Sequence, residues 1–396
     1  MTTPTSNQEV ELIEQLHQLA SRLSSTEDPG ARKEALQLSK RLATSLEKPE
    51  DVAASLVYSP VVHVTVRIAV HLELFKHIAN HETPISSTEL ATLSGGEELL
   101  IIRVLRSVSS IGLVDEVGER LWQANDITKA MFIDGIAAGI RMFGDMVAGA
   151  AQKAPKYLRE TGWQCPTDPH DGLMQYAFQT KLSTFEFFST MPGVFADFNM
   201  FMGNTMGARS YWVDWFPVQE RLLDGAMADS ALIVDVGGGR GHDLQAFHEK
   251  HPRQGRLVLQ DLTPVVGKTR DPNPAIESMS YDFFTPQPVE GARAYFFHHI
   301  LHDWSDVKCM EILARLRGSM KPGYSKLLIH EMIVPEQGAS TFHAMLDMAM
   351  MAFNSGMERT ERQWRELLEN AGFEVLKVWS PLEEDADGIV EAVLKE

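Results

Sequence analysis

Hydrophobic residues recur at helical spacing along the N-terminal part of the chain. Leu12, Leu16 and Leu19 lie three or four residues apart, and similar spacing returns beyond the following proline. Residues at this spacing share one helix face, so the pattern predicts two amphipathic helices within residues 8–48, interrupted near Asp28-Pro-Gly30. Such helices cannot bury their apolar faces alone, and we expect them to pack on the rest of the chain or on a second copy.

Residues 64–123 combine helical spacing with a short alternating segment. The predicted elements are a helix over residues 64–78, a short helix through Leu93, a helix over residues 97–111, and strands over residues 112–118 and 121–123. Ser86-Ser-Thr-Glu89 opens the short helix as a capping box, in which the two end residues bond each other's backbone N–H groups. The strands flank a Gly-Glu-Arg turn, and the whole set predicts a winged helix.

A winged helix suggests DNA binding, but the charges of this chain oppose it. The helix over residues 97–111 offers Arg103 and Arg106 against Glu97 and Glu98, and the chain has a formal net charge of -18. Because phosphate contacts dominate the affinity of proteins for nucleic acid, we expect no nucleic-acid partner. The same charge opposes binding to an anionic membrane surface.

Length and composition indicate a soluble, cytoplasmic protein of two or three domains. Cys165 and Cys309 are too few for a disulfide framework or a zinc pattern. The N-terminus lacks a basic flank with an apolar core, and no uninterrupted apolar stretch approaches the roughly 20 residues that span a bilayer. We divide the chain of 396 residues into an N-terminal helical extension (1–55), a winged-helix domain (56–135), a helical middle segment (136–220) and a C-terminal domain (221–396).

The most specific pattern is a buried-looking strand over residues 231–236 that runs into alternating glycines over residues 237–241. A glycine turn between a strand and a helix lets the backbone approach a nucleoside cofactor, because glycine has no Cβ and reaches positive φ cheaply. The dinucleotide fingerprint G-x-G-x-x-G fails in both registers, since its third glycine falls on His242 or Leu244.

The pattern D-x-G-x-G-x-G that starts at Asp235 instead resembles the first motif of S-adenosylmethionine-dependent methyltransferases. A second predicted strand over residues 256–260 ends in Asp261, close to the roughly 20-residue offset at which an acidic residue meets ribose hydroxyls. A helix cap or a solvated strand end would explain either aspartate alone. Their joint occurrence on one βαβ unit favours cofactor binding.

The order of a winged helix, a helical middle segment and a glycine-rich α/β domain resembles the plant caffeate and fungal secondary-metabolite O-methyltransferases. The resemblance covers residues 56–396. It implies an α/β fold with a Rossmann-like, seven-stranded, mostly parallel sheet, an N-terminal winged-helix dimerisation domain, and S-adenosyl-L-methionine as cofactor. It also implies a homodimer in which the winged helix closes over the partner's active site.

The resemblance further implies a set of cofactor contacts. They are Asp235, Gly237, Gly238, Gly239, Asp261, Leu262, Asp282, Phe283 and His298. Asp261 would meet the ribose, and Asp282 would meet the adenine amino group. The family usually has Lys or Arg at the position of His298, so the contacts at that edge of the cofactor stay open.

Residues 294–306 end in Leu301-His-Asp-Trp-Ser-Asp306, which resembles the family's catalytic motif and implies that His302 is the general base. A phenol with a pKa of about 10 is mostly protonated at neutral pH, and histidine can accept its proton because its own pKa lies near the operating pH. Glu331 and Glu358 fall where the family places carboxylates that orient the base. A surface carboxylate near a helix start would also explain Glu358.

Two features beside His302 have more than one interpretation. Asp303 is as readily a cap for the helix that runs through Leu316 as a participant in chemistry. A metal site formed by His298, His299 and His302 is not expected, because alternation along a strand places His298 and His299 on opposite faces.

Residues of the middle segment and of the helix before Glu358 are the candidate substrate contacts. The candidates are Phe178, Phe188, Met200, Met348, Met351 and Asn354. The alternative for most of them is a place in the core, which is the commoner position of Met and Phe at helical spacing.

These features predict an enzyme that transfers a methyl group from S-adenosylmethionine to a hydroxyl of an aromatic or polyketide-type secondary metabolite. Some fungal relatives keep the cofactor bound and catalyse dehydration or pericyclic ring closure without transferring its methyl group, and this is the alternative. The histidine motif favours methyl transfer, because a pericyclase needs no base that deprotonates a hydroxyl. A regulator built on the winged helix would need a basic face.

Overall fold

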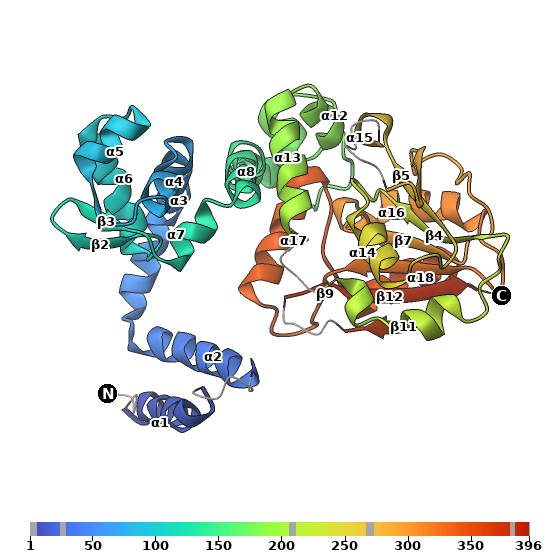
Figure 1. The fold of residues 1–396 in the computed structure, drawn as a ribbon, viewed down its shortest axis with the longest axis horizontal. Coiled ribbons are helices and arrows are strands. Elements are labelled where there is room, and N and C mark those ends of the chain that lie inside the picture. Colours follow the sequence, from blue (N-terminus) through green and yellow to red (C-terminus); the bar gives the residue numbers. More distant parts are fainter. Residues whose placement is uncertain (1–5, 24–28, 206–210, 267–272, 381–384, 396) are drawn as a thin grey trace.

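The structure is a computed structural model that describes residues 6–23, 29–205, 211–266, 273–380 and 385–395. Figure 1 shows an elongated molecule, with the helical N-terminal part at one end and a sheet covered by helices at the other. The helices of the middle segment lie between these two ends.

The two amphipathic helices predicted at the N-terminus are confirmed as α1 (Ser6–Leu23) and α2 (Pro29–Leu46). Their apolar faces pack against each other, and Leu12 and Leu19 of α1 are buried there together with Leu38 of α2. The predicted interruption falls partly on Asp28, which lies outside the described residues.

The prediction of one helix over residues 64–78 is wrong in two respects. A longer helix, α3 (Pro49–His71), begins well before Val64 and continues through Pro60, and α4 (Leu74–Ala79) follows it as a separate helix. The break lies at Glu73, whose φ of 50° is left-handed and cannot continue an α-helix. The boundary drawn between residues 55 and 56 therefore falls inside one helix.

The winged helix consists of three helices and a small sheet. After α4 come α5 (Ser87–Ser94), α6 (Glu98–Ser110) and strands β1 (Ile85–Ser86), β2 (Asp115–Gly118) and β3 (Leu121–Gln123), in the sheet order β1-β3-β2. The capping box is confirmed, because the Ser86 hydroxyl accepts from the Glu89 N–H and the Glu89 carboxylate accepts from the Ser86 N–H. Trp122 and Ile101 are buried in the core of this unit.

The middle segment is helical, as the sequence predicts. α7 (Asp126–Met131) precedes it. Its own helices are α8 (Asp134–Met142), the π-helix η1 (Phe143–Val147), α9 (Ala148–Ala151), α10 (Ala154–Glu160), α11 (Leu173–Phe178), α12 (Thr184–Ser189), α13 (Pro192–Thr205), the 3-10 helix η3 (Trp212–Asp214) and the π-helix η4 (Gln219–Leu223). α8 and α13 pack closely because Gly139 has no side chain. A Cβ there would lie 2.4 Å from the ring of Phe201.

The predicted seven-stranded, mostly parallel sheet is confirmed, with the order β11-β12-β8-β7-β4-β5-β6. Its strands are β4 (Ala231–Val236), β5 (Arg256–Asp261), β6 (Ile276–Ser280), β7 (Ala294–His298), β8 (Lys326–Glu331), β11 (Phe373–Trp379) and β12 (Gly388–Leu394). β12 pairs antiparallel with β8 and with β11, and the other pairs are parallel.

Alternate residues of each central strand enter two different cores. On β7, Tyr295 packs on one face with α16 (Asp306–Arg317) and α18 (Glu361–Asn370), whereas Phe296 packs on the other with α14 (His242–Lys250). Both faces of the sheet are thus covered, which explains why β4, β7 and β8 are buried along their whole length.

The chain reverses its direction of travel across the sheet at β4. From β4 it proceeds outward to β5 and β6, and it then returns to place β7 on the other side of β4. Ligands of open α/β sheets bind beyond the carboxyl ends of the strands at such a point. The glycine turn follows β4 and the histidine motif follows β7, so both lie at this position.

Five further elements belong to the sheet domain: α15 (Thr263–Val266), the 3-10 helix η5 (Leu301–Asp303), α17 (Thr341–Asn354), and the parallel pair β9 (Ile333–Val334) and β10 (Arg359–Thr360). The β9–β10 pair places Arg359 opposite Ile333. It thereby brings Glu358, which precedes β10, and Glu331, the last residue of β8, to the same edge.

Candidate active site

The glycine turn after β4 requires glycine at adjoining positions. Gly237 and Gly239 have φ values of 76° and 58°, and a Cβ on Gly238 would lie 2.2 Å from Oδ2 of Asp235. The N–H groups of Gly237 and Gly238 donate to the Gln260 carbonyl, which ties the turn to the end of β5. A Cβ built on Gly239 meets no atom within 4 Å among the described residues, so the turn borders open space there.

Asp235 lies beneath this turn and is completely buried. Burial raises the pKa of its carboxyl well above the ordinary value, and the nearby charge of Asp243 adds to the effect. Neither carboxylate oxygen has a hydrogen-bond partner among the described residues. Asp235 therefore occupies the space that a side chain on Gly238 would need.

Asp261 holds the same turn from the end of β5. Its Oδ2 accepts from the Gly239 N–H at 2.8 Å and its Oδ1 accepts from the Leu262 N–H at 2.7 Å. Burial raises its pKa, and these two hydrogen bonds oppose the rise. Leu262 itself is 47% exposed, next to the turn and outside the core.

Asp282 and Phe283 follow β6 on the same side of the sheet. The Asp282 carboxylate accepts from the N–H of Phe284, and the Phe283 ring lies 3.9 Å from a Cβ built on Gly237. The Phe283 ring also meets Trp304 edge-on, with centroids 5.8 Å apart. The structure thus brings the predicted cofactor contacts of β4, β5 and β6 to one edge.

The predicted histidine and two carboxylates come together after β7. Nδ1 of His302 lies 2.7 Å from Oε1 of Glu358 and 3.6 Å from Oε2 of Glu331. All three side chains are buried. The alternative of a surface carboxylate is therefore wrong for Glu358.

The two glutamates have different tasks. Glu358 bonds the imidazole directly, whereas Oε1 of Glu331 accepts from three consecutive backbone N–H groups, those of Ile300, Leu301 and His302, at 3.0, 2.8 and 3.3 Å. Glu331 therefore fixes the backbone that carries the histidine, and Glu358 holds Nδ1 of its ring.

The charges around His302 decide its protonation. Burial alone lowers the pKa of His302, but the negative charges of Glu331, Glu358 and Asp303 outweigh it and raise this pKa well above the ordinary value. Asp303 lies 3.7 Å from Nε2 of His302, and burial raises the pKa of its carboxyl to about 7. Asp303 is no helix cap, since the residue that precedes α16 as its N-cap is Ser305.

Sequence reasoning missed Arg359, which secures the histidine turn. Its completely buried guanidinium donates to the carbonyls of Leu301 and Trp304, at 3.0 and 2.9 Å, and pairs with Asp306 at 2.8 Å. Gly356 approaches the same turn so closely that a Cβ would lie 2.1 Å from the His302 carbonyl oxygen. In the sequence, only the adjacency of Arg359 to Glu358 pointed to a role in the site. An arginine in a polar segment is ordinarily expected to be exposed.

The candidate substrate contacts fall into two groups. Phe188 and Asn354 are fully buried. The Asn354 amide donates to the Asp303 carbonyl at 3.2 Å and accepts from the Thr184 N–H at 3.3 Å, so it joins the middle segment to the histidine turn. Phe178 and Met351 are partly buried in the same core, whereas Met200 is 37% and Met348 is 50% exposed.

A chain of aromatic rings connects the middle segment to the histidine turn. Phe185 contacts Trp304 at 6.1 Å and Phe353 at 5.4 Å between ring centroids, and Phe353 stacks on Phe198 at 6.0 Å. Phe353 and Trp304 were not among the predicted contacts. Their contacts with Phe185 follow from tertiary packing, which no local pattern reveals.

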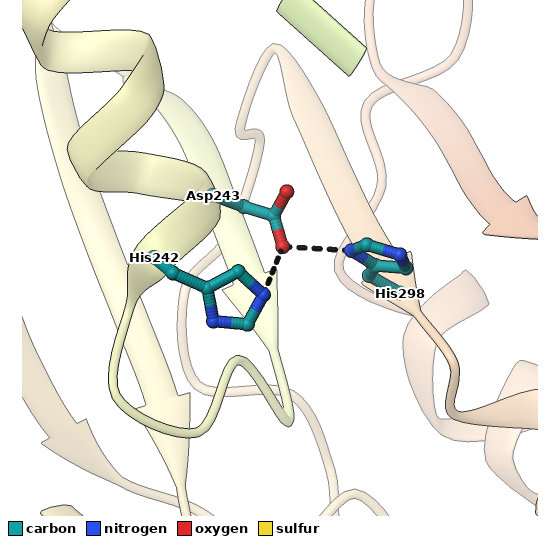
Figure 2. Close-up of side chains that lie close together, drawn as sticks. All are labelled: His242, Asp243 and His298. Carbon is teal, nitrogen blue, oxygen red and sulfur yellow. Dashed lines mark hydrogen bonds and ion pairs between the residues drawn. The ribbon is translucent and has the colours of Figure 1, made fainter. Parts of the chain in front are cut away.

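His298 lies in a buried cluster of ionisable groups. Figure 2 shows Asp243 between two imidazoles, with its Oδ2 atom 2.7 Å from Nδ1 of His298 and 3.1 Å from Nε2 of His242. Burial lowers the pKa of His298, but Asp243 and Asp387 reverse this and raise it to about 10. His298 thus supplies a positive charge at the position where the resemblance expects Lys or Arg.

The expectation that His298 and His299 occupy opposite faces is wrong. β7 ends at His298, and His299 takes a left-handed φ of 51°, so strand alternation no longer applies. The two rings lie 4.5 Å apart, and the His299 ring stacks on that of His302 at 5.0 Å.

Three groups in the described residues have the composition of metal ligands: His242, Asp243 and His298; His298, His330 and Asp387; and His302, Glu331 and Glu358. The first and third already contain short hydrogen bonds to His298 and His302. In the second, a protonated His298 lies between Asp243 and Asp387, and an imidazolium cannot ligate a metal. We therefore assign these groups to hydrogen bonding.

Comparison with known proteins finds relatives that match the chain nearly from end to end. The pattern of the O-methyltransferase domain matches residues 213–374. The O-methyltransferase penC of Penicillium thymicola is 50% identical over 383 residues, which cover 96% of each protein.

Solved structures agree in fold over the same length. LepI in complex with S-adenosylmethionine has a TM-score of 0.88 and 30% identity, covering 98% of this chain and 100% of LepI. OxaC in complex with S-adenosylhomocysteine and oxaline has a TM-score of 0.88 and 27% identity, with coverage of 99% and 100%. A structure described as a pericyclic reaction enzyme has a TM-score of 0.87 and 30% identity, with coverage of 98% and 99%.

Proposed function

The chain belongs to the S-adenosylmethionine-dependent O-methyltransferases of secondary metabolism, and we propose that it methylates a hydroxyl of an aromatic or polyketide-type small molecule, with His302 as general base. The observation that carries this proposal is the buried pair of His302 and Glu358. Methyl transfer to a hydroxyl needs a group that removes the hydroxyl proton, and a positioned imidazole is suited to the task.

The residues around the glycine turn fit the cofactor. Gly239 borders open space, Asp261 presents its carboxylate at the same edge, and Phe283 lies beside Gly237. When bound, S-adenosylmethionine supplies an activated methyl group on a sulfonium. We infer that Asp261 holds the ribose and that Asp282 and Phe283 hold the adenine.

The protein fixes the tautomer of the base through Glu358. When Nδ1–H of His302 donates to Glu358, the lone pair lies on Nε2, and Nε2 takes the proton of the acceptor hydroxyl. Glu358 and Glu331 then stabilise the imidazolium that forms, as carboxylates beside a new positive charge do. The three N–H groups bound to Glu331 keep the histidine in place during the step.

The aromatic rings next to His302 support an aromatic acceptor. Phe185 contacts both Phe353 and Trp304, the latter two residues beyond His302, and flat rings favour offset or edge contacts with another aromatic group. OxaC binds oxaline within the same fold. We propose an aromatic acceptor for this chain.

Mass spectrometry of purified protein with S-adenosylmethionine and a panel of phenolic, alkaloid and polyketide acceptors tests the proposal. We expect S-adenosylhomocysteine to form together with a product heavier by one methylene unit. An active panel member should lose methylation when its reactive hydroxyl is replaced by hydrogen. Protein that binds the cofactor but forms no S-adenosylhomocysteine with any acceptor would contradict it.

The alternative is a cofactor-bound enzyme that closes or dehydrates its substrate without methyl transfer. The structural similarity to a pericyclic reaction enzyme supports this alternative. The His302–Glu358 pair favours methyl transfer, because ring closure needs no hydroxyl-deprotonating base. In the same experiment, conversion of an acceptor with no gain in mass and no S-adenosylhomocysteine would select the alternative.

We also propose that the protein is a homodimer formed through its N-terminal helices. Leu56, Val57 and Tyr58 of α3 are 66%, 72% and 70% exposed, although a soluble helix usually buries such residues. By length and composition, α3 is the one helix among the described residues that could cross a membrane. A helix that packs against a second copy of the chain can be as apolar as a helix that crosses a membrane. The acidic residues Glu50 and Asp51 at the start of α3 favour packing against a second copy.

A further inference from the structure

The His299 ring lies nearly parallel to the ring of His302, the proposed general base. Its centroid is 5.0 Å from that of His302, and the two planes differ by 17°. Glu358 bonds one ring nitrogen of His302, and one hydrogen bond leaves the ring free to swing about the bond axis. A parallel ring on one face removes that freedom.

His299 is itself held in place by a buried carboxylate on another strand. Its Nε2 lies 2.8 Å from Oδ1 of Asp387, which directly precedes β12. Asp387 is buried, and its negative charge is stabilised by His299 and His298, which hold its pKa well below the ordinary value despite burial. The residue after it, Gly388, pairs with Glu331 in the sheet.

The backbone of His299 supports this arrangement. Its φ of 51° is a conformation that residues other than glycine adopt at a cost, and such positions concentrate at functional sites. The left-handed residue turns the chain out of β7 so that the His299 ring leaves the strand and meets His302. An extended residue here would direct the ring to the other face of the sheet.

We propose that His299 and Asp387 are positioning residues for the methyl transfer, because the ring that Asp387 anchors sets the plane of the His302 imidazole. The inference rests on the proposed role of His302 as general base. Together with Glu358, the stack aims Nε2 of His302 in one direction. A misdirected base should slow the chemical step and leave the binding of cofactor and acceptor unchanged.

Four variants separate the ring stack from the bond to Asp387. His299→Phe keeps a flat ring, and His299→Leu removes both the ring and the hydrogen bond. Asp387→Ala removes the anchor, and the double variant His299→Leu with Asp387→Ala tests their coupling. His251→Ala is the control, since His251 also contacts an aromatic ring, that of Phe247 with centroids 5.1 Å apart, outside the site.

We expect His299→Leu to lower kcat about 10- to 100-fold, as small misplacement of a reacting group does. The KM of the acceptor and the calorimetric affinity for S-adenosylmethionine should not change. His299→Phe should recover kcat only to the level of Asp387→Ala, because a phenyl ring can stack on His302 but cannot bond Asp387. Asp387→Ala should have little further effect in the His299→Leu background. His251→Ala should behave as wild type, and thermal melting of every variant checks the fold. If His299→Leu melts early, His299→Gln replaces it as the variant without a flat ring.

Four results would overturn the proposal. They are wild-type kcat in His299→Leu, equal loss in His299→Phe and His299→Leu, a parallel loss of cofactor affinity, or a full additional effect of Asp387→Ala in the double variant. A parallel loss of cofactor affinity would make His299 a cofactor contact. A full additional effect of Asp387→Ala would mean that Asp387 acts through His298. Wild-type protein that methylates no acceptor would instead refute the proposed function.

Discussion

At the scale of single residues, His302 has to be both held and neutral. Glu331, Glu358 and Asp303 surround it from β8, from the segment after α17 and from η5, and His299 contacts its face from the end of β7. The carboxylates orient the ring, but they also favour its protonated form. The same contacts that position the base therefore limit the pH range in which it can accept a proton.

This conflict predicts a specific pH dependence. Only neutral His302 accepts a proton. Because its pKa is raised, the neutral fraction increases only at pH values above the ordinary histidine pKa of about 6.5. We expect kcat/KM for the acceptor to rise with pH through the range above that value. Glu331→Gln removes one negative charge and should move the rising limb to lower pH. If kcat/KM of the wild type rises at or below the ordinary histidine pKa, the argument from the surrounding charges is wrong.

Removal of the base itself should affect turnover and not cofactor binding. His302→Ala should lower kcat by about 10² to 10⁴, the usual contribution of general base catalysis. The affinity for S-adenosylmethionine, measured by calorimetry, should stay as in wild type, because His302 contacts carboxylates and not the glycine turn. Near-normal methylation by the variant would refute the assignment of His302.

Asp261 predicts the opposite pattern. Its carboxylate braces the Gly239 and Leu262 N–H groups and lies where the ribose is expected. Asp261→Ala should weaken the binding of S-adenosylmethionine by about 1.5 to 3 kcal/mol, the loss for a hydrogen bond to a charged group. Glu277→Ala is a control on the neighbouring strand, where the side chain pairs with Arg256 at the surface. Equal affinities in calorimetry would exclude the ribose role.

At the scale of elements, the turn after β4 depends on the absence of side chains. A Cβ on Gly238 would overlap Asp235, whose buried position leaves it no room to move. Gly238→Ala should therefore lower the free energy of unfolding by about 1 to 3 kcal/mol, the usual cost of overpacking, and weaken cofactor binding as well. Gly193→Ala is the matched control, since nothing lies within 4 Å of its Cβ in the described residues. Thermal melting checks both, and an unchanged Gly238→Ala would contradict this account of the turn.

The elements that sequence predicts well are those with a local cause. The capping box at Ser86 and the strand before Gly237 each contain their determinants within a few residues. The errors have tertiary causes. The helix break at Glu73 involves no glycine or proline. His299 leaves its strand through a left-handed φ, which a histidine in the sequence does not predict.

The candidate site divides in the same way. The motif at His302 and the aspartates at the strand ends could be predicted, because parallel strands deliver their carboxyl ends to one edge. The separate tasks of Glu331 and Glu358, and the burial of Arg359, depend on the pairing of β9 with β10. Two residues from each segment form that pair, which is too short to leave a sequence pattern.

At the scale of the whole molecule, the two ends bury their apolar residues to different extents. The sheet domain covers both faces of its sheet with helices. In contrast, α3, which runs from the N-terminal pair into the winged helix, leaves most of its apolar residues exposed (Figure 1). An exposed apolar surface of this kind marks an interaction site. The predicted catalytic residues come together within one chain, and the N-terminal end is where we propose that a second copy binds.

The dimer proposal therefore predicts that charge on α3 separates the subunits. Leu56→Asp combined with Val57→Asp should convert a dimer to a monomer, because both side chains are mostly exposed in one chain and would be buried between two. Light scattering coupled to size-exclusion chromatography measures the mass directly. Leu376→Asp is the control, since Leu376 lies on strand β11 at the opposite end and is 42% exposed. A wild-type monomer would refute the dimer, and flotation of wild type with anionic vesicles would assign α3 to a membrane surface.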